Sequence, residues 1–318
     1  MSELISINKL PTRTWNRLSV NDAIIAWDEE NTALLADTDI QCAHGMSTSP
    51  VRLSLSDDGA SFTRKRVRLS VPQNSSVTVL VDCRPENNFN AILDLTVGKN
   101  SDVKLALLAE PSHGGICVHR TSVNCDENAG VEMITLLLGD GDVYLDNLVE
   151  LRGDNSSLKS DIAYIGCNGQ TVDMNVVVNH FGRNTKSEIN AAGALKDGAK
   201  KVFRGSIDFR KGSSGSVGAE NETVLMLGDD AVNKTVPLIL CAEENVDGNH
   251  GATIGELDRD TLFYFESRGI DKKTAENIMA RAAVERLAHL VNDEEFADEI
   301  MRAIGRKLGT EGENDNAV

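Results

Sequence analysis

The sequence predicts a mainly β protein with a repetitive core and a small helical part at its C-terminal end. Between residues 115 and 240, turn signals recur with leading glycines at positions 139, 153, 166, 182, 198 and 212, in steps of 14, 13, 16, 16 and 14 residues. The segments between these turns are strand-like and cover residues 131–138, 143–151, 158–165, 172–181, 187–195 and 202–209. No turn has room for a crossover helix of about a dozen residues, which excludes a doubly wound sheet.

Two architectures fit this spacing, an antiparallel meander and a parallel β-helix in which each strand stacks on its equivalent in the next turn. Aromatic residues make up only 4% of the 318 residues, and stretches such as 187–195 offer mainly small side chains for burial. A narrow β-helix interior accepts such side chains more readily than a broad sandwich core does. The pattern therefore favours the β-helix and leaves the meander open.

The overall charge limits the choice of partners. The chain has 49 acidic and 32 basic residues, a formal net charge of −17, which argues against a nucleic-acid surface and against adhesion to an anionic membrane. No segment approaches a membrane span of about 20 apolar residues, and the first 15 residues contain no apolar run of secretory length. We expect a cytoplasmic protein with no nucleic-acid and no membrane partner.

The six cysteines, at positions 42, 83, 117, 125, 167 and 241, form no Cys-x-x-Cys or Cys-x-x-His motif. The sequence therefore contains neither a zinc knuckle nor a four-cysteine cluster motif that one chain could complete. In a cytoplasmic protein we expect them to be reduced thiols, most of them buried as small hydrophobic side chains.

The N-terminal half divides into an arm and the start of the core. Residues 1–32 mix short apolar pairs with Trp15 and Trp27 and have no long period, so we expect a docking arm that lies on the main body. The β-helix core is predicted over residues 33–252. Its first part contains short alternating segments at 67–71 and 77–81, with turn clusters at 56–59 and 85–88.

Residues 253–309 are predicted to form a helical domain. Each helix begins at an aspartate that can cap it, and two end at a glycine: the caps are Asp258 or Asp260, Asp271 and Asp293, and the stops are Gly269 and Gly309. The helices either close the open end of the solenoid, as solenoids require, or form a docking platform for another protein. Residues 310–318 are polar, and we expect them to be disordered.

His250 is the histidine whose surroundings best suit chemistry. Glycines at 248, 251 and 255 predict a compact turn that presents its imidazole. The preceding segment carries Cys241, Glu243 and Glu244, and thiolate, carboxylate and imidazole groups suit iron or zinc. We take His250 and Cys241 as candidate metal ligands. No P-loop and no nucleophile elbow is present, so the chain contains no ATPase or esterase motif.

The segment NHGATIGELDRDTLFYFESRGI, residues 249–270, resembles the corresponding junction of the SufB/SufD family, the scaffold subunits of the Suf iron–sulfur cluster assembly machine. The similarity extends from about residue 115 to about residue 290. It implies a right-handed parallel β-helix and places His250 at an interface between scaffold subunits. The junction is SufD-like, because the SufB branch has Glu-His-Glu there and a cysteine near the position of Glu222.

The resemblance implies a non-catalytic scaffold that pairs with a SufB-like or identical subunit and binds a SufC-type ABC ATPase through its C-terminal helices. It also implies an iron–sulfur cluster that is held transiently and shared at a subunit interface. The side chains predicted to contact the ATPase are Phe263, Tyr264, Arg268, Ile278 and Leu287. The alternative is a carbohydrate-active β-helix lyase or hydrolase, in which Asp161, Asp173 and Glu188 would form a row of carboxylates on one face.

Overall fold

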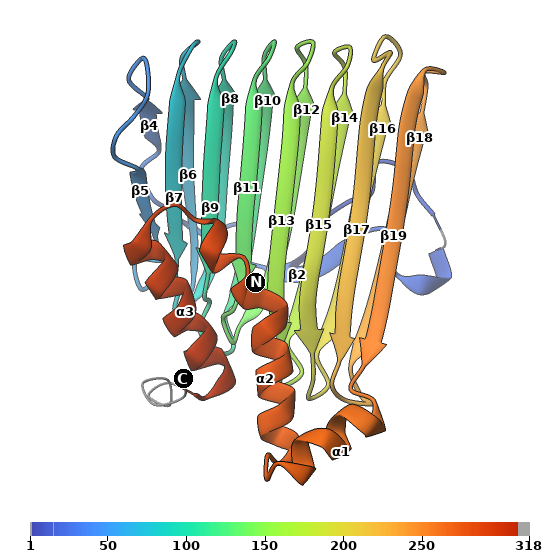
Figure 1. The fold of residues 1–318 in the computed structure, drawn as a ribbon. Coiled ribbons are helices and arrows are strands. Elements are labelled where there is room, and N and C mark those ends of the chain that lie inside the picture. Colours follow the sequence, from blue (N-terminus) through green and yellow to red (C-terminus); the bar gives the residue numbers. More distant parts are fainter. Residues whose placement is uncertain (1, 15, 311–318) are drawn as a thin grey trace.

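The computed structural model describes residues 2–14 and 16–310, and it contains a parallel β-solenoid with helices along one side (Figure 1). Its strands form a nine-stranded and an eight-stranded sheet, in which every strand pairs with the equivalent strand of the next coil. The predicted parallel β-helix is confirmed, and the antiparallel meander is wrong. The predicted disordered tail lies outside the described residues except for Thr310.

Two parallel sheets make up the solenoid. The nine-stranded sheet contains β3 (Ala33–Leu34), β4 (Thr38–Gln41), β6 (Phe62–Val71), β8 (Asn88–Val97), β10 (Ile116–Cys125), β12 (Asp142–Leu151), β14 (Thr171–His180), β16 (Lys200–Phe209) and β18 (Val232–Cys241). The eight-stranded sheet contains β5 (Val51–Leu55), β7 (Ser76–Cys83), β9 (Asp102–Ala109), β11 (Gly130–Leu137), β13 (Ser157–Gly166), β15 (Lys186–Leu195), β17 (Ser216–Met226) and β19 (Val246–Glu256). The six strands predicted between residues 131 and 209 correspond to β11–β16, with ends within two residues.

A ladder of asparagines stabilises one corner of the solenoid. Asn100, Asn128 and Asn155 occupy equivalent turn positions in successive coils, each with a left-handed φ of 55–60°, a conformation that asparagine tolerates better than most residues. The Nδ2 of Asn128 donates to Oδ1 of Asn100 (2.8 Å), and the Nδ2 of Asn155 donates to Oδ1 of Asn128 (3.0 Å). The same side chains therefore permit the turn and link each coil to the next.

The N-terminal arm lies against the nine-stranded sheet. Its strands β1 (Glu3–Ile7) and β2 (Ala23–Trp27) pair antiparallel, and buried Trp27 belongs to a small apolar cluster that includes Tyr144 of β12. The Nδ2 of Asn8 donates to Oδ1 of Asp173 (2.6 Å), which also pairs with the guanidinium of Arg204. A short 3₁₀ helix, η1 (Asn16–Leu18), connects the two strands.

Three α-helices and one 3₁₀ helix follow the last coil: α1 (Arg259–Ser267), α2 (Lys272–Glu285), η2 (Ala288–Leu290) and α3 (Glu294–Leu308). Asp258, Asp271 and Asp293 cap the three α-helices by accepting backbone hydrogen bonds of 2.7–2.9 Å, and Gly309 ends α3 in the left-handed conformation. The sequence therefore located the helix ends correctly, with Asp258 rather than Asp260 as the first cap.

The helices cover a side of the solenoid and not its end. Buried residues of α2 and α3, including Val284 and Ile300, pack on outward-facing side chains of the eight-stranded sheet such as Leu108 and Leu136. In Figure 1, α2 and α3 lie in front of that sheet, whereas α1 lies below the end of β19. The predicted closure of the open end by the helices is therefore wrong, because their apolar faces match an apolar sheet face.

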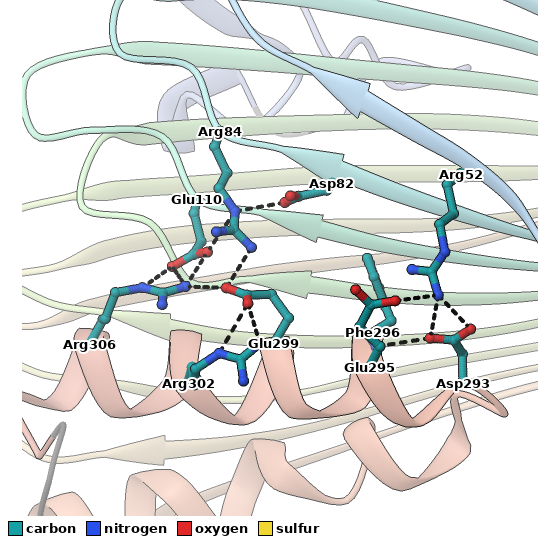
Figure 2. A network of polar contacts seen from close by, with 10 residues as sticks. All are labelled: Arg52, Asp82, Arg84, Glu110, Asp293, Glu295, Phe296, Glu299, Arg302 and Arg306. Atoms are coloured by element: carbon teal, nitrogen blue, oxygen red, sulfur yellow. Dashed lines mark hydrogen bonds and ion pairs between the residues drawn. The ribbon is translucent and has the colours of Figure 1, made fainter.

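Ionic contacts fix α3 to the sheet (Figure 2). Glu299 accepts from Arg84 of the loop after β7 (2.7 Å) and from Arg302 and Arg306 of its own helix (2.5 and 3.0 Å). Arg306 also reaches Glu110 after β9 (2.7 Å). These guanidinium groups lower the pKa of Glu299 to about 2, although partial burial acts in the opposite direction.

Candidate functional site

The last coil of the solenoid is open. Strands β18 and β19 each pair with a single neighbour in the part of the chain that the structure describes, β16 and β17 respectively. Nine of the eleven residues of β19 are exposed and none is buried, and Ile254 retains 60% of its accessible surface. From the sequence, the last two strands of the solenoid are expected at about 217–227 and 236–242. In the structure the first of these is β17, which β19 covers, so the uncovered edge is formed by β18 and β19.

His250 lies in the middle of β19, so the predicted glycine turn is wrong. Gly248 allows β19 to lie close to the opposite sheet, because a Cβ added there would lie 2.9 Å from the ring of Phe209 and 3.1 Å from Ile239. Because side chains alternate along a strand, His250 is on the same side as Gly248, facing the axis of the solenoid. The imidazole is exposed, since no further coil covers it.

Cys241 and His250 lie on different strands of the last coil. Cys241 is exposed at the end of β18 in the nine-stranded sheet, and His250 belongs to the eight-stranded sheet. In residues 2–14 and 16–310, no group of three or more His, Cys, Asp or Glu side chains is arranged to hold a metal ion. Glu243 binds the backbone N–H of Gly212 (3.0 Å) and is thereby used in a turn.

Beneath the open coil, three charged side chains are buried inside the solenoid. Lys201, Glu220 and Glu222 pair in register with the core residues Val172, Ile189 and Ala191, and are 0–2% exposed. Lys201 forms an ion pair with Oε1 of Glu222, whose Oε2 accepts from the hydroxyl of Thr235 (2.5 Å).

Glu220 differs from its neighbours. Burial raises its pKa to about 8, and the charge of Glu222 adds to this effect while Lys201 opposes it. Its Oε2 has no hydrogen-bond partner among the described residues. No motif in the sequence singles out this carboxyl, although a signal exists: Glu220 and Glu222 alternate along β17 with the same spacing as Val224, a core residue, and so face the same side of the strand.

The first C-terminal helix presents a second exposed surface. Helix α1 has no buried residue, and Phe263 and Tyr264 are 71% and 56% exposed. The guanidinium of Arg268 lies 5.0 Å from the ring centroid of Tyr264, a cation–π distance. On α2, Ile278 is 42% exposed. Leu287 is not available for contact, because it is 1% exposed and packs between helix and sheet.

The carboxylates proposed for the alternative enzyme do not form a row. Asp161 and Glu188 lie on the eight-stranded sheet, whereas Asp173 lies on the nine-stranded sheet. Asp173 is buried against Arg204 and Asn8, and Asp161 is also buried and lies near Lys159 and Arg286. These three carboxylates therefore cannot act together on a sugar chain.

These features define a parallel β-solenoid protein whose last coil and first C-terminal helix are both exposed. Residues 53–283 match the family described as "SUF system FeS cluster assembly, SufBD core domain", and the chain belongs to this family. The resemblance read from residues 249–270 is thereby confirmed.

Its relatives include both branches of the family. The chain is 28% identical over 262 residues to the iron–sulfur cluster assembly protein SufD of Bacillus subtilis, covering 80% of this chain and 59% of that protein. It is 26% identical to SufB of the same organism (70% and 49% covered) and 25% identical to SufD of Escherichia coli (57% and 43% covered). The chain therefore spans about half the length of these relatives. No helix within the described residues is long and apolar enough to cross a membrane.

Proposed function

We propose that this chain is a non-catalytic scaffold subunit of a Suf-type iron–sulfur cluster assembly complex. The observation that carries the proposal is the match to the SufBD core over residues 53–283. Two features support a scaffold and not an enzyme: the carboxylates of the alternative enzyme lie on different sheets, and the exposed surfaces are a sheet edge and a helix.

The open coil is the proposed site of pairing with a SufB-like subunit or a second copy of this chain. An uncovered strand edge offers unpaired backbone N–H and C=O groups and tends to pair with another strand. Two such ends that meet around a two-fold or pseudo-two-fold axis would bring His250 and its counterpart to the seam. The iron–sulfur cluster, as the cargo of the complex, would take ligands from both chains there.

Light scattering and anaerobic reconstitution test this part. We expect a dimer, alone or with a SufB-like partner, and we expect His250→Ala to keep folding and pairing but to lower the iron and sulfide retained. His113→Ala is the matched control, because His113 is exposed in a loop between β9 and β10. A monomer under both conditions would contradict the pairing, and unchanged iron and sulfide would contradict the role of His250.

The exposed face of α1 is the proposed docking surface for a SufC-type ABC ATPase. Large aromatic side chains and arginine carry much of the binding energy at protein interfaces. Phe263 and Tyr264 are exposed on α1, and Arg268, which caps its C-terminal end, lies over the ring of Tyr264. We expect Phe263→Ser with Tyr264→Ser to weaken co-purification with the ATPase at least about tenfold. Leu34→Ser is the control, because Leu34 is 73% exposed at the opposite end of the solenoid. Equal recovery of the ATPase by both variants would refute this docking site.

A further inference from the structure

Glu220 lies in a space that the rest of the coil leaves open for it. A Cβ added to Gly205, on the opposite sheet, would lie 2.3 Å from the carboxyl carbon of Glu220. The Glu220 carboxyl therefore extends across the interior to the backbone of the opposite sheet, where a side chain at position 205 would displace it. Glu220 is only 2% exposed, and its Oε2 has no hydrogen-bond partner among the described residues.

The charges inside the coil do not balance. Lys201 and Glu222 form a close ion pair that is neutral as a unit, and Thr235 satisfies the second oxygen of Glu222. Glu220 adds a carboxyl with no cation of its own. A buried carboxylate without a partner is costly, so proteins neutralise it with a proton or a cation, or pair it with a ligand.

The strand register brings this carboxyl next to His250. Glu220 and His250 are directly paired on the parallel strands β17 and β19. Neighbouring strands lie about 4.8 Å apart, and side chains at paired positions point to the same side of a sheet. Glu220 is thus the interior carboxyl of the last covered coil, and His250 is the exposed imidazole directly beyond it at the open end.

We propose that Glu220 is a second ligand that this chain contributes, with His250, to a divalent first-row transition-metal ion at the open end of the solenoid. Carboxylate oxygen and imidazole nitrogen suit Fe²⁺, Co²⁺ or Zn²⁺. Two protein ligands leave coordination positions for water or for groups of the pairing subunit, which agrees with the absence of a three-ligand group within the described residues. The site belongs to the pairing surface of the proposed function and rests on it.

Cobalt titration tests the assignment, because Co²⁺ bound by nitrogen and oxygen ligands absorbs visible light. Metal-free, tag-free protein would be titrated with CoCl₂ and followed by absorbance and calorimetry. We expect Glu220→Gln and His250→Ala each to weaken Co²⁺ binding at least about tenfold. The controls are Glu188→Gln, an exposed carboxyl on β15, and His113→Ala, both of which should bind as the wild type does.

The stability of the Glu220→Gln variant shows whether Glu220 acts as a metal ligand or supports the fold. Glu220→Gln replaces a buried carboxyl that has no counter-charge with a neutral group of nearly the same shape, so the metal-free variant should be at least as stable to urea as the wild type. Co²⁺ affinity equal to that of the wild type would overturn the proposal. So would a Glu220→Gln protein that loses affinity and stability together, because Glu220 would then act by supporting the fold. Neither result affects the scaffold role, which fails only if pairing and ATPase co-purification are absent.

Discussion

Among the ionic side chains of α3, we expect Glu299 to contribute most to the free energy of unfolding. Its carboxylate bonds to Arg84, Arg302 and Arg306 (Figure 2), and these contacts lower its pKa from 4.5 to about 2. A lowering of this size corresponds to roughly 3 kcal/mol of unfolding free energy. The side chain retains 22% of its exposure, so solvent and salt screen part of this value. We expect Glu299→Gln to lower the unfolding free energy by about 1–2 kcal/mol at pH 7.

The stabilising effect of Glu299 should depend on pH. A carboxyl whose pKa is lower in the folded state stabilises the fold above its unfolded pKa, and the contribution is lost as the pH falls through the folded pKa. The difference between wild type and Glu299→Gln should therefore be full above pH 5 and nearly gone at about pH 2. Urea unfolding at pH 7, 5 and 3 measures it. Glu295→Gln on the same helix is the control, because Glu295 is 80% exposed in its contact with Arg52 and should lose less than about 0.5 kcal/mol. A loss at pH 7 no larger than that of the control, or one that does not vary with pH, would refute the reasoning.

Two further predictions concern the solenoid itself. Asn128→Ala removes two ladder hydrogen bonds and forces alanine into a φ of 55°, so it should lower the unfolding free energy by about 2 kcal/mol. Asn128→Gly removes the same hydrogen bonds without the backbone strain and should lower it by about 1 kcal/mol. Equal losses in urea unfolding would contradict the contribution of backbone strain. Buried His180 forms hydrogen bonds with Thr185 (2.7 Å) and Ser187 (2.8 Å), and burial lowers its pKa to about 4. Because the unfolded chain then binds more protons than the folded protein below pH 6.5, the unfolding free energy should fall by on the order of 2 kcal/mol by pH 5. An NMR titration in which the His180 imidazole charges near pH 6.5 would contradict this.

The repeat was visible in the sequence because turns and strands are local. Asparagine and glycine punctuate the chain at near-constant intervals, and β11–β16 follow from that spacing alone. The ladder of Asn100, Asn128 and Asn155 repeats every 28 and 27 residues, about twice the step between successive turns, and could have been found by aligning every second turn. Helix ends were equally predictable, since the capping groups of Asp258, Asp271 and Asp293 lie within three residues of the N–H groups they bind.

The errors arose where distant parts of the chain decide the structure. Residues 246–256 contain three glycines, which favour turns, yet pairing with β17 holds them in a strand, because tertiary context overrides β-propensity. Leu287 has helical spacing suited to either an exposed or a buried face, and only the outward apolar side of the eight-stranded sheet buries it. The ion pair of Lys201 with Glu222 joins the two sheets of one coil, and no local pattern reports such a contact.

The position of the buried charges links the fold to the open end. Lys201, Glu220 and Glu222 are the buried charged groups that face the solenoid interior within the described residues, and all three belong to β16 and β17, the last coil that another coil covers. A core built for stability alone would have aliphatic side chains there, because buried ion pairs seldom improve on apolar packing. Glu220 goes further, since no counter-charge contacts its carboxyl among the described residues and this carboxyl lies against the backbone of Gly205 on the opposite sheet. These buried charges lie one coil below the exposed His250, and their position agrees with the proposed role of the open end as a pairing surface.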